Sequence, residues 1–453
     1  MSDHPQDLSL REQAQAIAEG ELDATELLEA TLARIEERDA PLRSIAESFA
    51  SESARMLSEA PEGPLHGVPV AVKDMFALPW RAPRDGCTRN LFGVEAGEST
   101  VYRRLRDAGA VIVAVTNMHE LGAGSTGHIS AYGPCATPWD TSRCGGGSSG
   151  GSGSSVGARL VAGAVGTDGG GSIRYPAAYC GVTGLKFTWG LVPPDGYTHG
   201  FSSMGAPGPM CRDAADARLL GGALLGRPLT ERRATTLRVG VAPWFWQNID
   251  PEVEAACRAA LGALSDSGLE TREVELDGAE HVIIATVITL ALEGIPSIKP
   301  ELVAEVAPHL SPVGRALSKY NMLLPGAATV RVDRVRAQLR RALAGAFEDV
   351  DVLAWPTVPA PPPPIEDPAL ELPSGRVPAD YGNVRQGGIG NLSGVPALSV
   401  PCGLTADRLP IALQLLAPWG EDERLLDVAE LLEQATDRRH VDAVPPIAEP
   451  TRA

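Results

Sequence analysis

The chain has 453 residues, 44% of them hydrophobic, and a formal net charge of −18 at pH 7. This length and apolar content are enough for a large buried core, and the acidic balance argues against a broad nucleic-acid-binding surface, which needs a basic face. Seven scattered cysteines without a Cys-x-x-Cys pair predict neither a disulfide framework nor a zinc site. Because no signal-peptide pattern or run of about 18 apolar residues occurs, we expect a cytoplasmic protein without membrane contact.

The predicted elements alternate between helices and short apolar strands. The first helices span residues 8–19 and 26–38; Gly20 ends the first, and Asp23 with Glu26 resembles a capping box for the second. Apolar runs typical of buried strands follow, with helices between them. The strands are predicted at 68–72, 111–115, 237–241, 352–355 and 397–400, and the helices at 101–108 and 251–265. The pattern indicates an α/β fold.

The chain shows no low-complexity linker that would divide it into domains. A chain of this length corresponds to about three domains of average size, but single domains with large α/β folds exceed that size. The proline run at residues 359–364 is predicted to be a surface loop and not a boundary. We therefore expect one domain.

Two glycine- and serine-rich segments enclose a short apolar stretch. The first reads Cys-Gly-Gly-Gly-Ser-Ser-Gly-Gly-Ser from Cys144, and the second reads Gly-Thr-Asp-Gly-Gly-Gly-Ser-Ile-Arg and ends at Arg174. Glycines let a substrate approach backbone N–H groups and serines supply nucleophilic hydroxyls, so the pattern is typical of a hydrolase site. A flexible linker would not enclose the apolar residues 160–165.

Other sites rich in glycine and serine fit less well. A phosphate-binding P-loop needs a lysine beside its glycines, and none lies between Lys73 and Lys186. The nucleophile-elbow pattern Gly-x-Ser-x-Gly matches at Ser149 and Ser155, but residues 137–143 before it are turn-rich and not a buried strand. An esterase of the α/β-hydrolase type stays open as an alternative, with Ser149 and one of His199, His281, His309 or His440.

Lys73 is the candidate base for a serine nucleophile. Only four of the 39 basic residues are lysines, so a lysine in this arginine-rich chain indicates chemistry that an arginine cannot perform. Lys73 follows the apolar run 68–72, where loss of water would lower the pKa of its ammonium group. The structural alternative is a strand-end lysine that reaches solvent.

Together with flanking segments, these residues resemble the amidase signature family. Similar segments occur along nearly the whole chain, at residues 65–69, 116–121, 132–134, 138–140, 181–186, 391–397 and 409–415. The resemblance implies one large mixed β-sheet wrapped by helices on both faces. It also implies a single amidase domain over 1–453, with N-terminal helices in 1–60, the catalytic signature core in 61–230 and the remaining α/β body, with substrate-pocket segments, in 231–453.

The resemblance further implies a Ser–cis-Ser–Lys triad. Ser172 matches the nucleophile, Ser148 the bridging serine in a cis peptide, and Lys73 the base, so that a proton passes from Ser172 through Ser148 to Lys73. Backbone N–H groups of the nucleophile loop would form the oxyanion hole, and three further residues would support the site. The oxyanion residues are Gly169, Gly170, Gly171 and Ser172, and the supporting residues are Ser149 and the ion pair of Asp168 with Arg174.

Substrate contacts follow less directly from the resemblance. Amidotransferase A subunits of this family, which are similar in size, hold glutamine with an arginine and an aspartate. Arg336 is similar in position to that arginine, whereas Val384 or Arg385 occupies the place of the aspartate, so Arg385 is a candidate for binding a carboxylate on another substrate. Met118 and His119, the latter where relatives commonly have aspartate, are candidates at the pocket mouth. Residues 280–330 either shape the pocket or form core helices.

The predicted function is an amidohydrolase that cleaves a carboxylic amide through a Ser172 acyl-enzyme and releases ammonia or an amine. No metal or organic cofactor is implied. The main alternative is a partner-dependent amidotransferase subunit, and either a homodimer or a small partner subunit is compatible with the sequence. Besides the small-molecule amide, we expect neither a nucleic acid nor a membrane as a partner.

Overall fold

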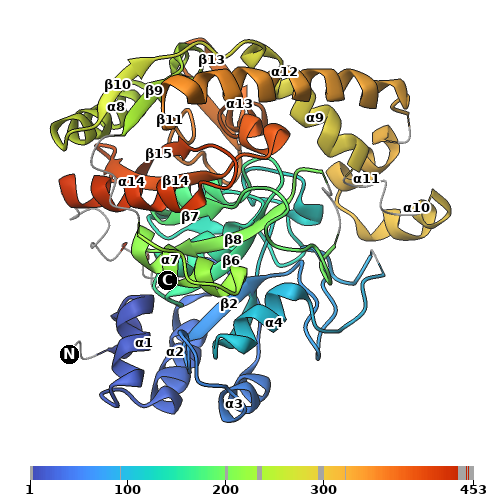
Figure 1. Cartoon of the computed structure of the whole chain (residues 1–453). Coiled ribbons are helices and arrows are strands. Elements are labelled where there is room, and N and C mark those ends of the chain that lie inside the picture. Colours follow the sequence, from blue (N-terminus) through green and yellow to red (C-terminus); the bar gives the residue numbers. More distant parts are fainter. Residues whose placement is uncertain are drawn as a thin grey trace.

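A single mixed sheet of 11 strands organises the molecule (Figure 1). The computed structural model describes residues 4–91, 93–198, 203–231, 237–293, 300–321 and 323–436, together with Pro445 and Ile447. In spatial order the strands are β1 (Ile45–Ser48), β3 (Val111–Thr116), β2 (Pro69–Lys73), β6 (Gly163–Asp168), β8 (Ala206–Cys211), β7 (Thr183–Lys186), β14 (Ala397–Leu404), β15 (Pro410–Leu416), β11 (Val352–Pro356), β9 (Arg238–Val241) and β10 (Glu270–Glu273).

Helices cover both faces of this sheet, as the family resemblance implies (Figure 1). Two short hairpins, β4 (Ala136–Thr137) with β5 (Asp140–Cys144) and β12 (Ala369–Leu372) with β13 (Gly375–Pro378), lie outside it. The helices are α1 (Leu10–Ala18), α2 (Ala24–Arg38), α3 (Ala50–Ser58), α4 (Thr100–Asp107), α5 (Gly150–Gly157), α6 (Arg174–Cys180), α7 (Ala214–Leu225), α8 (Pro251–Asp266), α9 (Val282–Glu293), α10 (Pro300–Val306), α11 (Pro312–Asn321), α12 (Ala327–Asp349), α13 (Ala379–Ser393) and α14 (Asp422–Ala435).

Every strand predicted from the sequence is present, and the central ones explain why the apolar runs are continuous. Strands β2, β3 and β6 pair in parallel, and each residue in all three is buried. Parallel strands covered by helices on both faces need apolar side chains on both faces. The carboxyl ends of β2 and β6 therefore meet at one edge of the sheet, where functional loops usually gather.

Two local predictions need correction. The side chain of Asp23 caps α2 by accepting from the N–H groups of Thr25 and Glu26, but the reciprocal bond that defines a capping box occurs at α1, between Ser9 and Glu12. The proline run at 359–364 is mostly buried and is not a surface loop. It packs on the β4–β5 hairpin, where the backbone N–H of Cys144 donates to the carbonyl of Pro363 and the guanidinium of Arg143 donates to that of Pro362.

Helices α9, α10 and α11 extend from one side of the molecule (Figure 1). Helix α9 packs against α12 and α13, and α11 packs against α9. Within the described ranges, no helix combines the length and the apolar character that crossing a membrane requires.

Candidate active site

Lys73 lies at the carboxyl end of β2, where its side chain is completely buried. Its Nζ donates to Ser148 Oγ at 2.7 Å and to Thr167 Oγ1 at 2.8 Å. The register of the parallel pair explains the second contact: Val72 lies opposite Val165, so Lys73 and Thr167 extend past the same edge from adjacent strands. Ser148 follows a cis peptide bond between Gly147 and Ser148.

Burial lowers the pKa of Lys73 to about 7, although the negative charges of Asp85 and Asp168 oppose the shift. Both hydroxyls that accept from the ammonium group are neutral, and no carboxylate among the described residues bonds directly to it. A substantial share of neutral amine is therefore available near neutral pH, which is the state that a general base requires.

The two glycine- and serine-rich segments lie against each other. The first leads into α5, and the second forms the turn between β6 and α6. The backbone N–H of Ser149 donates to the carbonyl of Ser172 at 3.1 Å, which holds Ser172 beside the chain segment that contains Ser148. The hydroxyl of Ser149 is buried and bonds to the backbone of Thr167, where it donates to the carbonyl and accepts from the N–H. Ser149 thus links the two segments.

Asp168 and Arg174 form the predicted ion pair, with both side chains fully buried. Arg174 Nε donates to Asp168 Oδ2 at 2.9 Å and its Nη2 to Oδ1 at 3.0 Å. Burial alone would raise the pKa of Asp168, but the charge and hydrogen bonds of Arg174 outweigh it and lower that pKa to about 2. Arg174 also donates to Asn391 on α13 and to Gln414 on β15, so this pair connects the loop to the C-terminal part of the sheet.

The loop at 169–172 presents backbone N–H groups next to Ser172. The N–H of Gly171 donates to Asp168 Oδ1 at 2.7 Å, so it is already occupied, while those of Gly170 and Ser172 have no acceptor among the described residues. Gly171 has a φ of 123°, and a Cβ there would lie 1.9 Å from the ring of Tyr175. Only glycine fits this turn, because any side chain would overlap the aromatic ring.

Ser172 lines a cavity of about 400 Å³. Gly169, Gly170 and Tyr175 surround it at the sheet edge. The remaining walls come from the loop 121–125, from α9 and α11, and from the first residues of α13. The cavity is large enough for a small organic amide, and most of its lining is apolar.

The four residues proposed to contact substrate do not line this cavity. Met118 is fully buried, and the backbone N–H of His119 donates to the carbonyl of Ser148 at 3.0 Å. Burial lowers the pKa of His119 to about 4, and its Nδ1 accepts from the N–H of Gly127. Arg336 donates to the carbonyls of Ser203 and Leu392, and Arg385 donates to those of Trp244 and Gln247 and lies over the Trp244 ring. Both guanidinium groups are held by carbonyls instead of facing the cavity.

Two features of the site were missed by sequence reasoning. Thr167 is a direct partner of Lys73, and Asn391 bonds to both Asp168 and Arg174. Asn391 begins a family-like segment, which was a usable signal, and Thr167 directly precedes Asp168. Residues 280–330 show no family motif, and in the structure they contribute both buried positions and cavity-lining positions.

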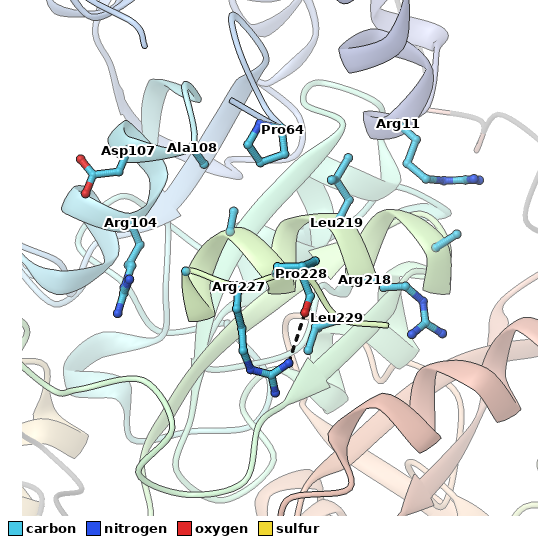
Figure 2. A pocket seen from close by; sticks show the side chains of 14 residues that line it. Arg11, Pro64, Arg104, Asp107, Ala108, Arg218, Leu219, Arg227, Pro228 and Leu229 are labelled. Atoms are coloured by element: carbon cyan, nitrogen blue, oxygen red, sulfur yellow. Dashed lines mark hydrogen bonds between the residues drawn. The ribbon is translucent and has the colours of Figure 1, made fainter. Parts of the chain in front are cut away.

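A second cavity of about 630 Å³ lies between α1, α4 and α7 (Figure 2). Four arginines border it, but Arg11, Arg218 and Arg227 pair with carboxylates. None of the sequence-predicted site residues lines it. In the part of the chain that the structure describes, no group of three or more His, Cys, Asp or Glu side chains is arranged to hold a metal ion.

Comparison with known proteins agrees with this architecture. Residues 26–426 match the family model Amidase. The A subunit of glutamyl-tRNA(Gln) amidotransferase from Chromohalobacter salexigens is 33% identical, over 95% of this chain and 97% of that protein. A crystal structure of an amidase is 31% identical, with a TM-score of 0.90 over 95% of this chain and all of that one. A substrate complex of 6-aminohexanoate cyclic dimer hydrolase is 25% identical, with a TM-score of 0.87 over 98% of this chain and all of that one.

The fold and the family match define the class of protein: an enzyme that acts on C–N bonds, either a hydrolase or an amidotransferase. The chain belongs to the amidase signature family. This membership overturns the esterase alternative, which needs the α/β-hydrolase fold. The hydroxyl of Ser149 also bonds to the Thr167 backbone, and no histidine among the described residues bonds to it; His199 and His440 lie outside those residues.

Proposed function

We propose that the protein hydrolyses carboxylic amides, with Ser172 as the nucleophile, Ser148 as the proton relay and Lys73 as the base. The observation that supports this most strongly is the pair of hydrogen bonds from a fully buried Lys73 to the hydroxyls of Ser148 and Thr167. A neutral amine beside a serine hydroxyl can accept a proton, and Ser172 borders a cavity that a substrate can enter.

The proposed reaction has two halves. In the first, Ser172 Oγ attacks the amide carbon while its proton passes to Ser148, whose own proton moves to Lys73. The N–H groups of Gly170 and Ser172 stabilise the negative charge on the carbonyl oxygen, an effect worth about 10²–10³ in rate for one donor. When the C–N bond breaks, Lys73 returns the proton through Ser148 to the leaving nitrogen. In the second half, water attacks the acyl-enzyme by the same relay and releases the carboxylic acid.

Asp168, Arg174 and Ser149 act as positioning residues in this scheme. Asp168 accepts from the N–H of Gly171, and Ser149 bonds to both Thr167 and Ser172. These contacts fix the direction in which the remaining N–H groups of the loop point. Such donors assist a reaction only when they are already oriented toward the developing charge.

The test is ammonia release from a panel of primary amides by the wild type, Ser172→Ala and Ser155→Ala proteins. We expect the Ser172→Ala protein to lose activity by about 10⁴-fold or more. Ser155 lies in the first glycine- and serine-rich segment, where it is buried and its hydroxyl donates to the carbonyl of Ser152, so Ser155→Ala is the matched control for removal of one serine hydroxyl. Equal activity of wild type and Ser172→Ala would refute the nucleophile.

A second candidate function is that of an amidotransferase component that uses glutamine as its amide donor together with a partner chain. Its support is that several A subunits of glutamyl-tRNA(Gln) amidotransferase are 31–35% identical over 93–95% of this chain. The two functions differ in what the isolated chain does. Hydrolysis of amides other than glutamine without a partner favours the first candidate, and activity with glutamine that requires an added partner favours the second.

A further inference from the structure

We propose that the amide accepted by this cavity bears an apolar aryl or alkyl group and no carboxylate. The inference rests on the proposed hydrolase function and names its substrate class. Three observations support it. An apolar wall lies beside Ser172, a carboxylate lines the cavity, and the two candidate arginines, Arg336 and Arg385, bond to backbone carbonyls elsewhere.

The apolar wall comes mainly from two helices. Val287, Leu290 and Ala291 of α9 face the cavity, together with Val313 and Leu317 of α11. Val287 and Val313 are 46% and 48% exposed, and Tyr381 at the start of α13 is 56% exposed. Large apolar side chains that stay exposed around one cavity indicate a surface that an apolar ligand covers.

This wall lies next to the reacting groups. The methyl carbon Cδ1 of Leu290 is 3.5 Å from the position that a Cβ on Gly170 would occupy, so α9 packs directly over the nucleophile loop. A substrate whose carbonyl oxygen faces the N–H groups of this loop therefore extends its substituent along α9. The group attached to the carbonyl carbon should accordingly be apolar.

Asp380 is the only acidic or basic side chain among the described residues that line the cavity. Its Oδ1 accepts from the N–H of Ser125 at 2.6 Å and from the hydroxyl at 2.8 Å, and its side chain is exposed. No ion pair neutralises it within the described part of the chain. A carboxylate on the substrate would meet a like charge here, whereas a neutral group would not.

The arginines that could have received a carboxylate point elsewhere. The guanidinium groups of Arg336 and Arg385 each donate to two backbone carbonyls, as described above. Val384, one residue before Arg385, lines the cavity with an apolar side chain. The described lining therefore offers no cation to a carboxylate such as that of glutamine.

The experiment compares two amides that differ only at the far end. In 4-phenylbutanamide a phenyl group ends the three-carbon chain, and in glutaramate a carboxylate takes its place. For the wild type we expect kcat/KM for 4-phenylbutanamide to exceed that for glutaramate by about 100-fold or more, since an aromatic ring gains from burial and a carboxylate is repelled.

The role of Asp380 is tested with the Asp380→Asn protein. We expect the ratio of kcat/KM for glutaramate to that for 4-phenylbutanamide to rise about tenfold, because the repelling charge is gone. Asp407→Asn removes the same charge from an exposed turn between β14 and β15 and should leave the ratio as in the wild type. An unchanged ratio in Asp380→Asn would remove that residue from the proposal.

Binding to the Ser172→Ala protein, measured by titration calorimetry, separates the substrate class from the catalytic function. Tighter binding of 4-phenylbutanamide than of glutaramate supports the inference even if neither amide is hydrolysed by the wild type, an outcome that would count against the function alone. Tighter binding of glutaramate, or binding of neither below about 10 mM, overturns the inference. Rapid release of ammonia from glutaramate by the wild type would support the function and refute the substrate class.

Discussion

Two buried lysines at strand ends, Lys73 on β2 and Lys186 on β7, differ in what surrounds them and not in how deeply they lie. Both side chains are fully buried, and in both cases burial lowers the pKa to about 7. Lys73 donates to the hydroxyls of Ser148 and Thr167, while Lys186 donates to the backbone carbonyl of Phe187 at 2.9 Å. A carbonyl has no proton to pass on, whereas a hydroxyl can accept one and release another.

The comparison teaches that a lowered pKa alone does not make a catalytic lysine. Lys186 also lies near Asp168, Arg174 and Asp422, whose charges act on its pKa in opposite directions. It is therefore part of the charged network behind the nucleophile loop. Lys73 is distinguished by its bond to the hydroxyl of Ser148, the residue proposed as the proton relay.

The largest expected difference between the two lysines appears when each is replaced with methionine. Lys73→Met should lower kcat/KM by about 10³–10⁴-fold, because the base is lost. Lys186→Met, which keeps a side chain of similar length in a buried site, should lower it by no more than about tenfold. Steady-state kinetics on the best amide, with circular dichroism to confirm folding, provides the measurement. Equal losses would erase the distinction between the two lysines.

The pH profile sharpens the comparison. If neutral Lys73 is the base, kcat/KM should rise about tenfold per pH unit below pH 7 and level off above it, since deprotonation of Lys73 has a pKa of about 7. The Lys186→Met protein should keep the same midpoint. Measurement of kcat/KM between pH 5.5 and 9 tests this expectation. A midpoint that shifts in the Lys186→Met protein would mean that the profile reports deprotonation of Lys186 and not of Lys73.

Thr167 gives a smaller effect. Thr167→Val removes one of the two hydroxyls that hold Lys73 Nζ, and kcat should fall about tenfold because the amine is less firmly directed at Ser148. Thr167→Ser keeps the hydroxyl and should recover most of the rate. A valine variant as active as the serine variant would show that Ser148 alone positions Lys73.

The last effect concerns stability and not activity. Both lysines have folded-state pKa values near 7 and an ordinary value of 10.5, so between these values the unfolded chain binds protons that the folded chain does not. The free energy of unfolding should therefore rise with pH in this window, by at most about 1.4 kcal/mol per pH unit for each lysine. Urea unfolding of Lys186→Met at pH 7 and 9 should show a smaller rise than the wild type.

The sequence was sufficient for five strands of the sheet, at residues 68–72, 111–115, 237–241, 352–355 and 397–400. Continuous apolar runs predicted β2 and β3 because buried parallel strands need no alternation. The scarcity of lysine and the apolar run at 68–72 singled out Lys73 before any contact was known. The sequence was not sufficient for Thr167, since that contact depends on how β2 and β6 are aligned. For residues 280–330 the sequence left two alternatives, because an apolar helix such as α9 can face either the core or a ligand, and the structure shows both kinds of position.

Arginine contacts were the least predictable part of the site. Family resemblance suggested Arg336 and Arg385 as substrate contacts, yet their guanidinium groups bond to backbone carbonyls. The sequence can place an arginine on a helix. The contacts of its long side chain, which has five N–H donors, depend on which acceptors lie nearby in the folded structure. Side-chain direction therefore needed the structure.

The hydrogen bonds from Arg174 to Asn391 and Gln414 determine when the site can be complete during synthesis. Arg174 and Gln414 are 240 residues apart along the chain. At typical translation rates of about 5–20 residues per second, Gln414 is made roughly 10–50 s after Arg174. A ribosome-bound chain that ends before β15 already contains Lys73, Ser148, Ser172 and Asn391 but lacks Gln414, the last of these partners of Arg174 to be made. Full amide-cleaving activity should thus appear only once the last strand of the sheet has been added.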